Sequence, residues 1–336
     1  MSANPNYLAS PSYSAIQDAI QIKVDSGWQS QITTFHPILA SIFDMGHNWN
    51  KSLIQMAGST KVRGAILYDE LAHLTPETAG LAGSEMLPRD LMQYPDIEGY
   101  THAEFEMAYL QTKFAMTPKE QMIANGARGN LLDAKIQTIT EAFKRILSQS
   151  LASDRAQSEK YVGGLDHVLS TSNTVGGISQ ASRAWWRANV RTGTNALTAS
   201  HIDNDYDAIT GIRGQEPDLL LATQNTTMNV YRRIADFIQT PLRLTVAPDA
   251  NKGLARYGYK SFEWNGMSVV ADTKGTTGTY RMLTTNTWHV KGSKSPKALE
   301  PKRIQESESM GYLFSMWFCL ACLEPRQNLR RAGITS

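Results

Sequence analysis

The chain has 336 residues, of which 41% are hydrophobic and 19% are charged. This length is enough for two domains or for one elaborated domain with a substantial core, and the composition is typical of a globular protein. The formal net charge of +2 excludes a strongly basic polyanion-binding protein and an acidic solubility module. No apolar run reaches the length of about 18 residues that a membrane-spanning helix requires. The first residues lack the pattern of a signal peptide, so we expect the chain to stay in the cytoplasm where it is made.

The N-terminal third is expected to form an extended arm and a long hairpin. Residues 1–35 are polar with scattered aromatic side chains, which is typical of an arm that packs on another surface. Lys61–Tyr68 alternates in part between polar and apolar residues, and Phe105–Phe114 carries the same period. Prolines and glycines are frequent between these two runs. We therefore predict two long strands paired around a long tip.

The tip of this predicted hairpin is acidic. From Asp69 to Glu106 the chain carries nine acidic residues, and Arg89 is its only Lys or Arg. Paired carboxylates can perform acid–base catalysis, but acids dispersed along a loop are more typical of a solvated or partner-facing surface. We interpret the tip as an inter-subunit surface formed by Asp69, Glu70, Glu77, Glu85, Asp90, Asp96 and Glu98.

The clearest helical pattern covers residues 131–152, and Asn130 is expected to cap it. A helix of this length spans about 33 Å. Its apolar residues fall on one helical face: Leu132, Ile136, Ile139, Phe143, either Ile146 or Leu147, and Leu151. The opposite face, which is expected to meet solvent or another subunit, carries Lys135, Glu141, Lys144 and Arg145.

A glycine turn and a tryptophan pair follow this helix. Gly176 and Gly177 permit backbone angles that other residues avoid. Ser179 is then expected to cap a short helix that continues through Val190. Trp185 and Trp186 lie about 100° apart on such a helix, so one ring can enter the core while the other covers its rim. Together with Arg187, these residues predict a packed structural junction.

The C-terminal half predicts a layer of strands and helices. Pro217–Ala222 reads as a buried strand, and Asn225 or Thr226 is expected to cap the helix that follows it. Phe262–Val270 contains Asn-Gly between two strand-like runs, which favours a hairpin with a type I′ turn. Further strands are predicted at Tyr280–Val290 and Tyr312–Leu323.

The sequence offers no motif for catalysis, metal binding or cofactor binding. Asp203–Asp207 begins like a calcium loop, but Ala208 replaces the required glycine and Gly214 replaces the bidentate glutamate, so a polar loop is expected. Cys319 and Cys322 have the spacing of a redox or zinc pair, but no second ligand pair accompanies them. We interpret both cysteines as buried small hydrophobic residues. An active site assembled from dispersed residues stays open as an alternative.

The order of these segments resembles one family, the tailed-bacteriophage major capsid proteins of the Hong Kong 97 (HK97) type. The resemblance rests on the long hairpin, the long helix, Gly163-Gly164-Leu165, Val175–Ile178 with Trp185–Arg187, and the strands that end before Glu324–Gln327. It implies an α+β fold. It also implies an N-terminal arm at 1–35 and an extended hairpin, the E-loop, at 58–115. A peripheral domain is implied at 36–57 and 116–164, with a spine helix at 131–152. An axial domain is implied at 165–275, followed by C-terminal strands at 276–336 that return to the peripheral domain.

The resemblance implies a structural protein of the virion capsid rather than an enzyme. Such a chain assembles with itself in the bacterial host cytoplasm. Its pentamers and hexamers form a closed icosahedral shell around double-stranded DNA. The chain contacts this DNA weakly and without sequence preference. Scaffold, portal and decoration proteins are further expected partners, and no membrane is involved. The acidic tip and the basic end formed by Arg326, Arg330 and Arg331 suggest charge-complementary subunit contacts. The alternatives are an encapsulin-like compartment and, from other classes, a soluble α/β enzyme or a tail or adhesion component.

The resemblance also generates a testable prediction about covalent crosslinks. Some members of this family join neighbouring subunits by a bond between an E-loop lysine and an asparagine. No lysine occurs from Val62 to Thr112 in this chain. We therefore expect boiled, denatured particles to migrate as single subunits on a denaturing gel. A ladder of covalent multimers would contradict this prediction.

Overall fold

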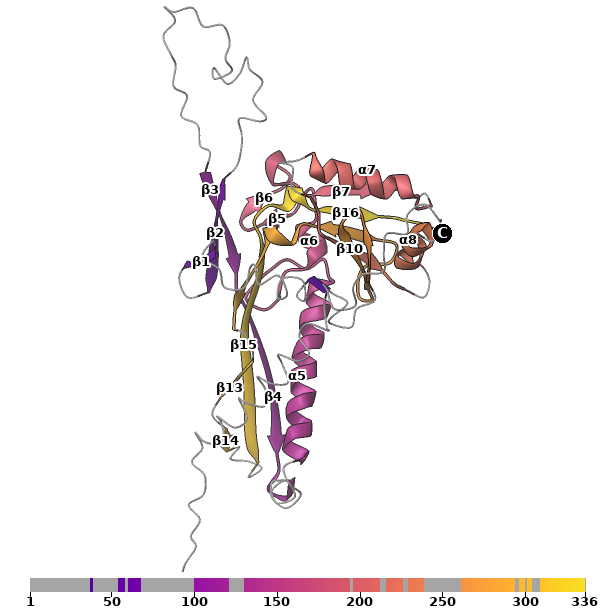
Figure 1. Cartoon of the computed structure of the whole chain (residues 1–336). Helices are drawn as coiled ribbons and strands as arrows, with labels where there is room; N and C mark the ends of the chain where they lie inside the picture. The colour runs from indigo at the N-terminus through magenta and orange to yellow at the C-terminus, as the bar shows by residue number, and fades with distance from the viewer. Residues whose placement is uncertain are drawn as a thin grey trace, which may run out of the picture.

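The computed structural model describes most of the chain. The described residues are 37–38, 54–57, 60–67, 100–120, 130–193, 196–211, 216–225, 229–238, 261–293, 296–299, 301–303 and 309–335. In the view of Figure 1 they form a broad body, a narrow extension below it that is called the arm from here on, and a short hairpin beside it. This arm is distinct from the predicted N-terminal arm. No helix in these ranges is long and apolar enough to cross a membrane. The predicted N-terminal arm, residues 1–35, lies outside the described residues.

A six-stranded sheet of order β7-β16-β11-β8-β10-β9 forms the body. Its strands are β7 Asn189–Thr192, β8 Leu219–Thr223, β9 Ser261–Trp264, β10 Met267–Asp272, β11 Tyr280–Leu283 and β16 Leu329–Ala332. The central strand β8 is parallel to β10 and antiparallel to β11. All five residues of β8 are buried, which explains why its sequence is a continuous apolar run rather than an alternating one.

Two helices share a core with one face of this sheet. They are α7 Ala199–Thr210 and α8 Val230–Ile238. Their buried isoleucines and valine pack in one cluster with Leu220 and Ala222 of β8. Side chains alternate along a strand, so Leu219 and Leu221 point to the other face, where they belong to a second cluster. Strand β8 therefore contributes to both cores of the molecule.

The arm is organised around β15 Met310–Cys322, a 13-residue strand. Four strands pair with it: β4 Ala108–Met116, β12 Trp288–Gly292, β13 Lys297–Ala298 and β14 Lys302–Arg303. Beside β4 runs the helix α5 Asn130–Leu151, so the prediction of a long helix at 131–152 is confirmed, shifted by one residue at each end. The predicted strand at 312–323 is also confirmed as β15, which begins two residues earlier and ends one residue earlier.

The hairpin is a three-stranded sheet of order β1-β2-β3. Its strands are β1 Ile54–Ala57, β2 Lys61–Leu67 and β3 Tyr100–Glu106, and the predicted antiparallel pairing of the first extended run is confirmed for β2 and β3. The prediction of one strand over Phe105–Phe114 is wrong, because the ladder breaks at Met107. The N–H of Met107 donates to the carbonyl of Thr60 at 2.7 Å, and β4 then pairs with β15 instead of β2.

Shorter elements connect these layers. They are α6 Leu165–Val168, β5 Thr174–Val175, β6 Ile178–Ser179, and the 3-10 turns η3 Ala184–Trp186, η5 Thr285–Thr287 and η6 Pro325–Gln327. The predicted single strand at 280–290 is wrong, because η5 divides it into β11 and β12. These two strands lie in different sheets, so the chain crosses from the body to the arm at this point.

Two local predictions near the body sheet have opposite outcomes. Asn265 and Gly266 join β9 to β10 with φ of 47° and 80°, which confirms the type I′ hairpin. The predicted cap of the following helix at Asn225 or Thr226 is wrong, because α8 begins at Val230. The side chain of Asn229 accepts the N–H of Arg232 at 2.8 Å and takes the place of the expected cap.

The predicted polar face of α5 is only partly exposed. Glu141 and Arg145 are exposed and Lys135 is half-buried, but Lys144 retains only 2% of its accessible surface. Burial lowers the pKa of the Lys144 amine to about 8, although the nearby charge of Glu141 opposes this shift. The expectation that Lys144 meets solvent or another subunit is therefore wrong, since the C-terminal half of the helix is buried within the chain on more than one face.

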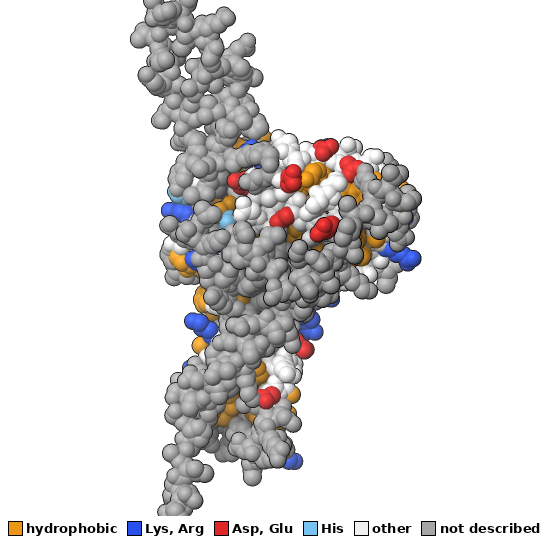
Figure 2. Space-filling view, viewed as in Figure 1, with side chains coloured by type: hydrophobic (Ala, Val, Ile, Leu, Met, Phe, Trp, Pro, Cys, Tyr) orange, Lys and Arg blue, Asp and Glu red, His pale blue; other side chains and the backbone are white. Residues whose placement is uncertain are grey.

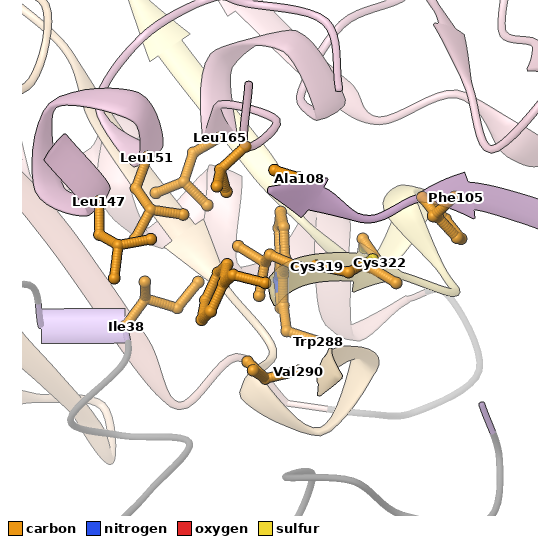
Figure 3. Close-up of a cluster of buried hydrophobic side chains, with 14 of the residues drawn as sticks. Ile38, Phe105, Ala108, Leu147, Leu151, Leu165, Trp288, Val290, Cys319 and Cys322 are labelled. Atoms are coloured by element: carbon orange, nitrogen blue, oxygen red, sulfur yellow. The ribbon is translucent and has the colours of Figure 1, made fainter. Parts of the chain in front are cut away.

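A single hydrophobic cluster joins the arm, the hairpin and the underside of the body. It contains Leu147 and Leu151 of α5, Phe105 of β3, and Trp288 of β12, together with Leu219 and Leu221 of β8. Figure 3 shows residues of this cluster converging from helices and strands that are far apart in the sequence. The parts visible in Figure 1 are therefore lobes around one shared interior rather than independent units.

Candidate functional site: a buried junction and two ion clusters

The predicted glycine turn lies against β3. Gly176 and Gly177 connect β5 to β6 with φ of 58° and 79°, in the left-handed region that favours glycine. The carbonyl of Gly176 accepts the N–H of Glu104 at 2.9 Å. A Cβ on Gly176 would lie 2.8 Å from the Cβ of Ala103, whereas nothing lies within 4 Å of the same position on Gly177. Gly176 is thus required by both its backbone angle and its close approach to β3.

Both tryptophans of the predicted junction are buried. Trp186 retains 1% of its accessible surface and Trp185 retains 9%, so the expectation that one ring covers a rim is wrong. Their rings meet edge to face with centroids 5.7 Å apart. The indole Nε1 of Trp186 donates to the carbonyl of Val175 at 3.0 Å, which ties the rings to the glycine turn.

The predicted helix from Ser179 to Val190 is wrong. This segment contains the single 3-10 turn η3, and β7 begins at Asn189. Its conformation is held by side chains that satisfy backbone carbonyls. The amide of buried Gln180 donates to the carbonyls of Val168 and Trp186 at 2.9 and 3.2 Å. The guanidinium of Arg187 donates to the carbonyl of Gln180 at 2.6 Å and also to that of Ala181.

A buried ion cluster connects α6 to the body sheet. Arg281 of β11 is fully buried, and its Nε and Nη2 donate to the two carboxylate oxygens of Asp166 at 2.6 and 2.8 Å. Its Nη1 donates to Asp272 at 2.9 Å, and the hydroxyl of Thr276 donates to Asp166 at 2.9 Å. Burial alone would raise the pKa of Asp166, but the hydrogen bonds and charge of Arg281, with a smaller effect of Arg330, hold that pKa below its usual value.

A second cluster connects α7 to the last strand. Asp205 is buried. Its carboxylate accepts hydrogen bonds from Nε and Nη2 of Arg331, both at 2.7 Å, and from the hydroxyl of Tyr280 at 2.6 Å. Burial, together with the charge of Asp205, raises the pKa of Tyr280. The expectation of a polar loop at Asp203–Asp207 is therefore wrong, because the segment lies inside α7 and Asp205 faces the sheet.

Two arginines of the predicted basic end, Arg330 and Arg331, lie beside acidic residues of the same chain. Arg331 binds Asp205, and Nε of Arg330 lies 3.6 Å from Asp166. These two side chains are therefore already engaged in the subunit, and they do not offer free charges to the acidic tip of another copy. On the face shown in Figure 2, acidic side chains gather over the body.

The two cysteines are free and buried, as predicted. The Sγ of Cys319 accepts a hydrogen bond from Nε2 of Gln157 at 3.0 Å, and the Sγ of Cys322 accepts one from Nδ2 of Asn328 at 3.7 Å. Burial raises the pKa of each thiol to about 12, which keeps both in the unreactive thiol form. Their side chains point to opposite faces of β15, as strand geometry requires for residues three apart.

The seven predicted acidic surface residues, Asp69, Glu70, Glu77, Glu85, Asp90, Asp96 and Glu98, lie outside the described residues. Within the described ranges, no three His, Cys, Asp or Glu side chains gather in a way that could hold a metal ion.

The structure brings the five predicted junction residues together around the Gly176 turn and Trp186. It also adds Asp166, Asp205, Asp272 and Arg281, which the sequence reasoning missed. A charged residue in an otherwise apolar strand was a usable signal for Arg281 in β11 and for Asp272 at the end of β10. Asp166 and Asp205 lie on helices and carried no such signal.

The tryptophan pair generates a stability prediction. Trp186→Ala should lower the free energy of unfolding of the unassembled subunit by about 3–5 kcal/mol, because a fully buried ring leaves a cavity. Trp186→Phe retains most of the packing and loses the hydrogen bond to Val175, so it should cost clearly less. Urea unfolding followed by circular dichroism measures both variants. A loss below about 1 kcal/mol for Trp186→Ala would contradict the observed burial.

The Arg281 cluster generates a prediction with a pH dependence. Asp166→Asn should cost about 3–5 kcal/mol at neutral pH, because it leaves a buried guanidinium without its bidentate partner. The folded pKa of Asp166 lies below its unfolded value, so its stabilising effect is present above about pH 4 and is lost as the pH falls through the folded pKa. The variant should lack this part of the acid dependence, measured by urea unfolding across pH. Exposed Asp207→Asn is the matched control and should change little; equal effects of the two variants would contradict the prediction.

Comparisons with known proteins identify the fold. No protein-family model matches the sequence, and no curated protein matches it. Among solved structures, the chain is similar to the capsid asymmetric unit of Cyanophage A-1(L), with 13% identity, a TM-score of 0.58, and coverage of 90% of this chain and 94% of that one. It is also similar to the capsid of the native GTA particle, at 8% identity, TM-score 0.56 and coverage of 88% and 90%. The holo-SrpI encapsulin complex from Synechococcus elongatus matches at 13% identity, TM-score 0.54 and coverage of 90% and 89%. The chain therefore has the α+β HK97-like major capsid fold.

Proposed function

We propose that this chain is the major capsid protein of a tailed bacteriophage and assembles into an icosahedral shell. The observation that carries the proposal is the extent of the structural match. A phage capsid chain and an encapsulin each match 90% of this chain, and the match covers 94% and 89% of their own chains. The likeness therefore extends over most of a shell subunit rather than over one shared domain.

The shape of the subunit supports association as its mechanism. The hairpin β1-β2-β3 and the arm both extend away from the body (Figure 1). Large apolar side chains remain exposed on these extensions, including Met56 at 47%, Leu299 at 39% and Trp317 at 37%. Neighbouring copies in a shell would cover such surfaces.

The proposal assigns roles to the lobes. The six-stranded body corresponds to the axial domain at the centre of each pentamer or hexamer. Its sheet extends beyond the expected residues 165–275, because β11 and β16 come from the segment 276–336 that was expected to return to the peripheral domain. We assign α5 with the arm sheet to the peripheral domain and its spine helix. The hairpin corresponds to the base of the E-loop. Double-stranded DNA would meet the inner face through weak, sequence-independent contacts with the phosphates. Scaffold, portal and decoration proteins complete the expected set of partners, with assembly in the host cytoplasm.

An encapsulin-like compartment is the second candidate function. Its support is the similarity to the encapsulin complex, whose TM-score of 0.54 is close to that of the phage capsid. The two candidates share the fold and the closed shell, and they differ in what the shell encloses.

The proposal predicts closed shells. Purified protein should form particles of uniform diameter under assembly conditions, visible by negative-stain electron microscopy and as a fast species in sedimentation velocity. Protein that stays monomeric under all such conditions would count against both candidates. Particles isolated from their natural source should contain nuclease-protected double-stranded DNA, whereas particles filled with a protein cargo and free of DNA would favour the compartment.

A further inference from the structure

The hairpin and the arm meet at a break in one extended segment. Strand β3 ends at Glu106 and β4 begins at Ala108. The first pairs with β2 and the second with β15, so the two strands belong to different sheets. In Figure 1 the hairpin extends in one direction from this break and the arm extends in the other. The angle at the break therefore decides where the hairpin points.

The loop between α5 and α6 crosses this break and binds both sides of it. This loop, residues 152–164, is called the strap from here on. Nε2 of Gln157 donates to the carbonyl of Glu106, the last residue of β3. Two residues further along the strap, the carbonyl of Glu159 accepts the N–H of Tyr109 in β4 at 2.8 Å. The strap therefore holds the end of one strand and the start of the next.

The amide of Gln157 also reaches the central strand of the arm. Its Nε2 donates to Sγ of Cys319 in β15 at 3.0 Å, in addition to the carbonyl of Glu106. An amide nitrogen carries two hydrogens, so both are used in these two bonds. Cys319 is fully buried in the shared hydrophobic cluster, where close packing makes it a fixed point. Through this one side chain the end of the hairpin is tied to the core of the arm.

The outer edge of β3 is bound at a second point. This strand lies at the edge of the sheet β1-β2-β3, so its outward N–H and C=O groups need partners from elsewhere. Backbone groups of alternate residues point to the same edge of a strand. The N–H of Glu104 donates to the carbonyl of Gly176 at 2.9 Å, and two residues later the carbonyl of Glu106 accepts the hydrogen bond from the strap. Two tethers on one edge fix an orientation that a single tether would leave free to rotate.

Two glycines give the strap its shape. The N–H of Gly164 donates to the carbonyl of Arg155 at 3.0 Å, which closes the strap on itself. A Cβ on Gly164 would lie 1.8 Å from the carbonyl oxygen of Ser153, so no other residue fits there. A Cβ on Gly163 would lie 3.0 Å from the Cβ of Gln157, so this glycine leaves room for that side chain. The glycine pair thus places Gln157 at the break.

The outer part of the strap is held by contacts of its own. Ser158 and Tyr161 exchange two backbone hydrogen bonds, of 3.0 and 3.2 Å. The guanidinium of Arg155 lies 5.1 Å from the ring centroid of Tyr161, within the range of a cation–π contact. These contacts join strap residues to one another rather than to the hairpin. The shape of the strap is therefore set independently of the hairpin that it holds.

We propose that the strap fixes the angle between the hairpin and the arm, with Gln157 as its positioning residue. A fixed angle preorganises the subunit for association, since less freedom is lost when copies meet. That consequence rests on the proposed function, whereas the strap itself is a property of the single subunit.

Spin labels on the hairpin, the arm and the body test the proposal in the unassembled subunit. Lys61→Cys carries the hairpin label, and either Lys302→Cys or Lys274→Cys carries the reference label, all at exposed positions. The two native cysteines are buried with pKa values raised to about 12, so they stay unlabelled. Double electron–electron resonance should give narrow distance distributions for both label pairs, because two tethers hold the hairpin.

Gln157→Leu keeps much of the size of the side chain and removes its donors. It should broaden both distance distributions about twofold or more, since one of the two tethers on β3 is lost. Gly163→Ala should act in the same direction by displacing Gln157. The matched control is Ser158→Ala, which removes a hydroxyl that accepts the N–H of Lys160 within the strap. This control should leave both distributions narrow.

Equal widths for wild type and Gln157→Leu would overturn the proposal, even if urea unfolding showed the variant to be less stable. Gln157 would then contribute to stability without setting the angle. Broad distributions in the wild type, or equal broadening in Ser158→Ala, would overturn it as well. Failure of the wild-type protein to form shells would count against the proposed function instead, and the spin-label result would still decide whether the strap holds the hairpin.

Discussion

The backbone ladder of β15 is the interaction on which the rest of the subunit depends. Buried N–H and C=O groups must be paired, and this strand satisfies them by pairing with four other strands. Three of these, β12, β13 and β14, directly precede it in the sequence, and β4 comes from the first half of the chain. The ladder with β4 joins the residues that follow the hairpin to the C-terminal region, and the ladder with β12 joins the arm to the segment that has just left the body sheet. The helix α5 can pack against the arm because these ladders present a continuous apolar face to it.

The ion clusters have a different role from the apolar core. Burying Arg281 with Asp166 and Asp272 carries a large desolvation cost, so the cluster is weak evidence for stability as such. It does constrain geometry, because a bidentate guanidinium accepts only a narrow range of orientations. Asp166 lies on α6, just after the connection from α5, whereas Arg281 lies in the body sheet. The cluster therefore fixes the position of α6 on the body sheet, and Asp205 with Arg331 does the same for α7 and the last strand.

The sequence predicted what is encoded locally and missed what depends on distant partners. The helix α5 follows from a continuous apolar stripe, and the Asn265-Gly266 turn follows from the φ preferences of two adjacent residues. By contrast, Asp205 looked like part of a polar loop because its partners, Tyr280 and Arg331, lie 75 and 126 positions away. The break at Met107 was equally invisible, since alternation continues through it and only the change of pairing partner marks it. The acids of residues 69–98, seven of the predicted site residues, lie outside the described residues, so their role stays a prediction.

The shared hydrophobic cluster limits how a shell of these subunits can change its curvature. Residues of the arm, the hairpin base and the underside of the body contribute to one interior, and close-packed interiors resist continuous deformation. Rotating the body against the arm would open that interior. We therefore expect each subunit to move in a shell as one rigid element, so that hexamers and pentamers differ in the angles between subunits rather than in a hinge within them. In that case curvature is a property of the contacts between copies.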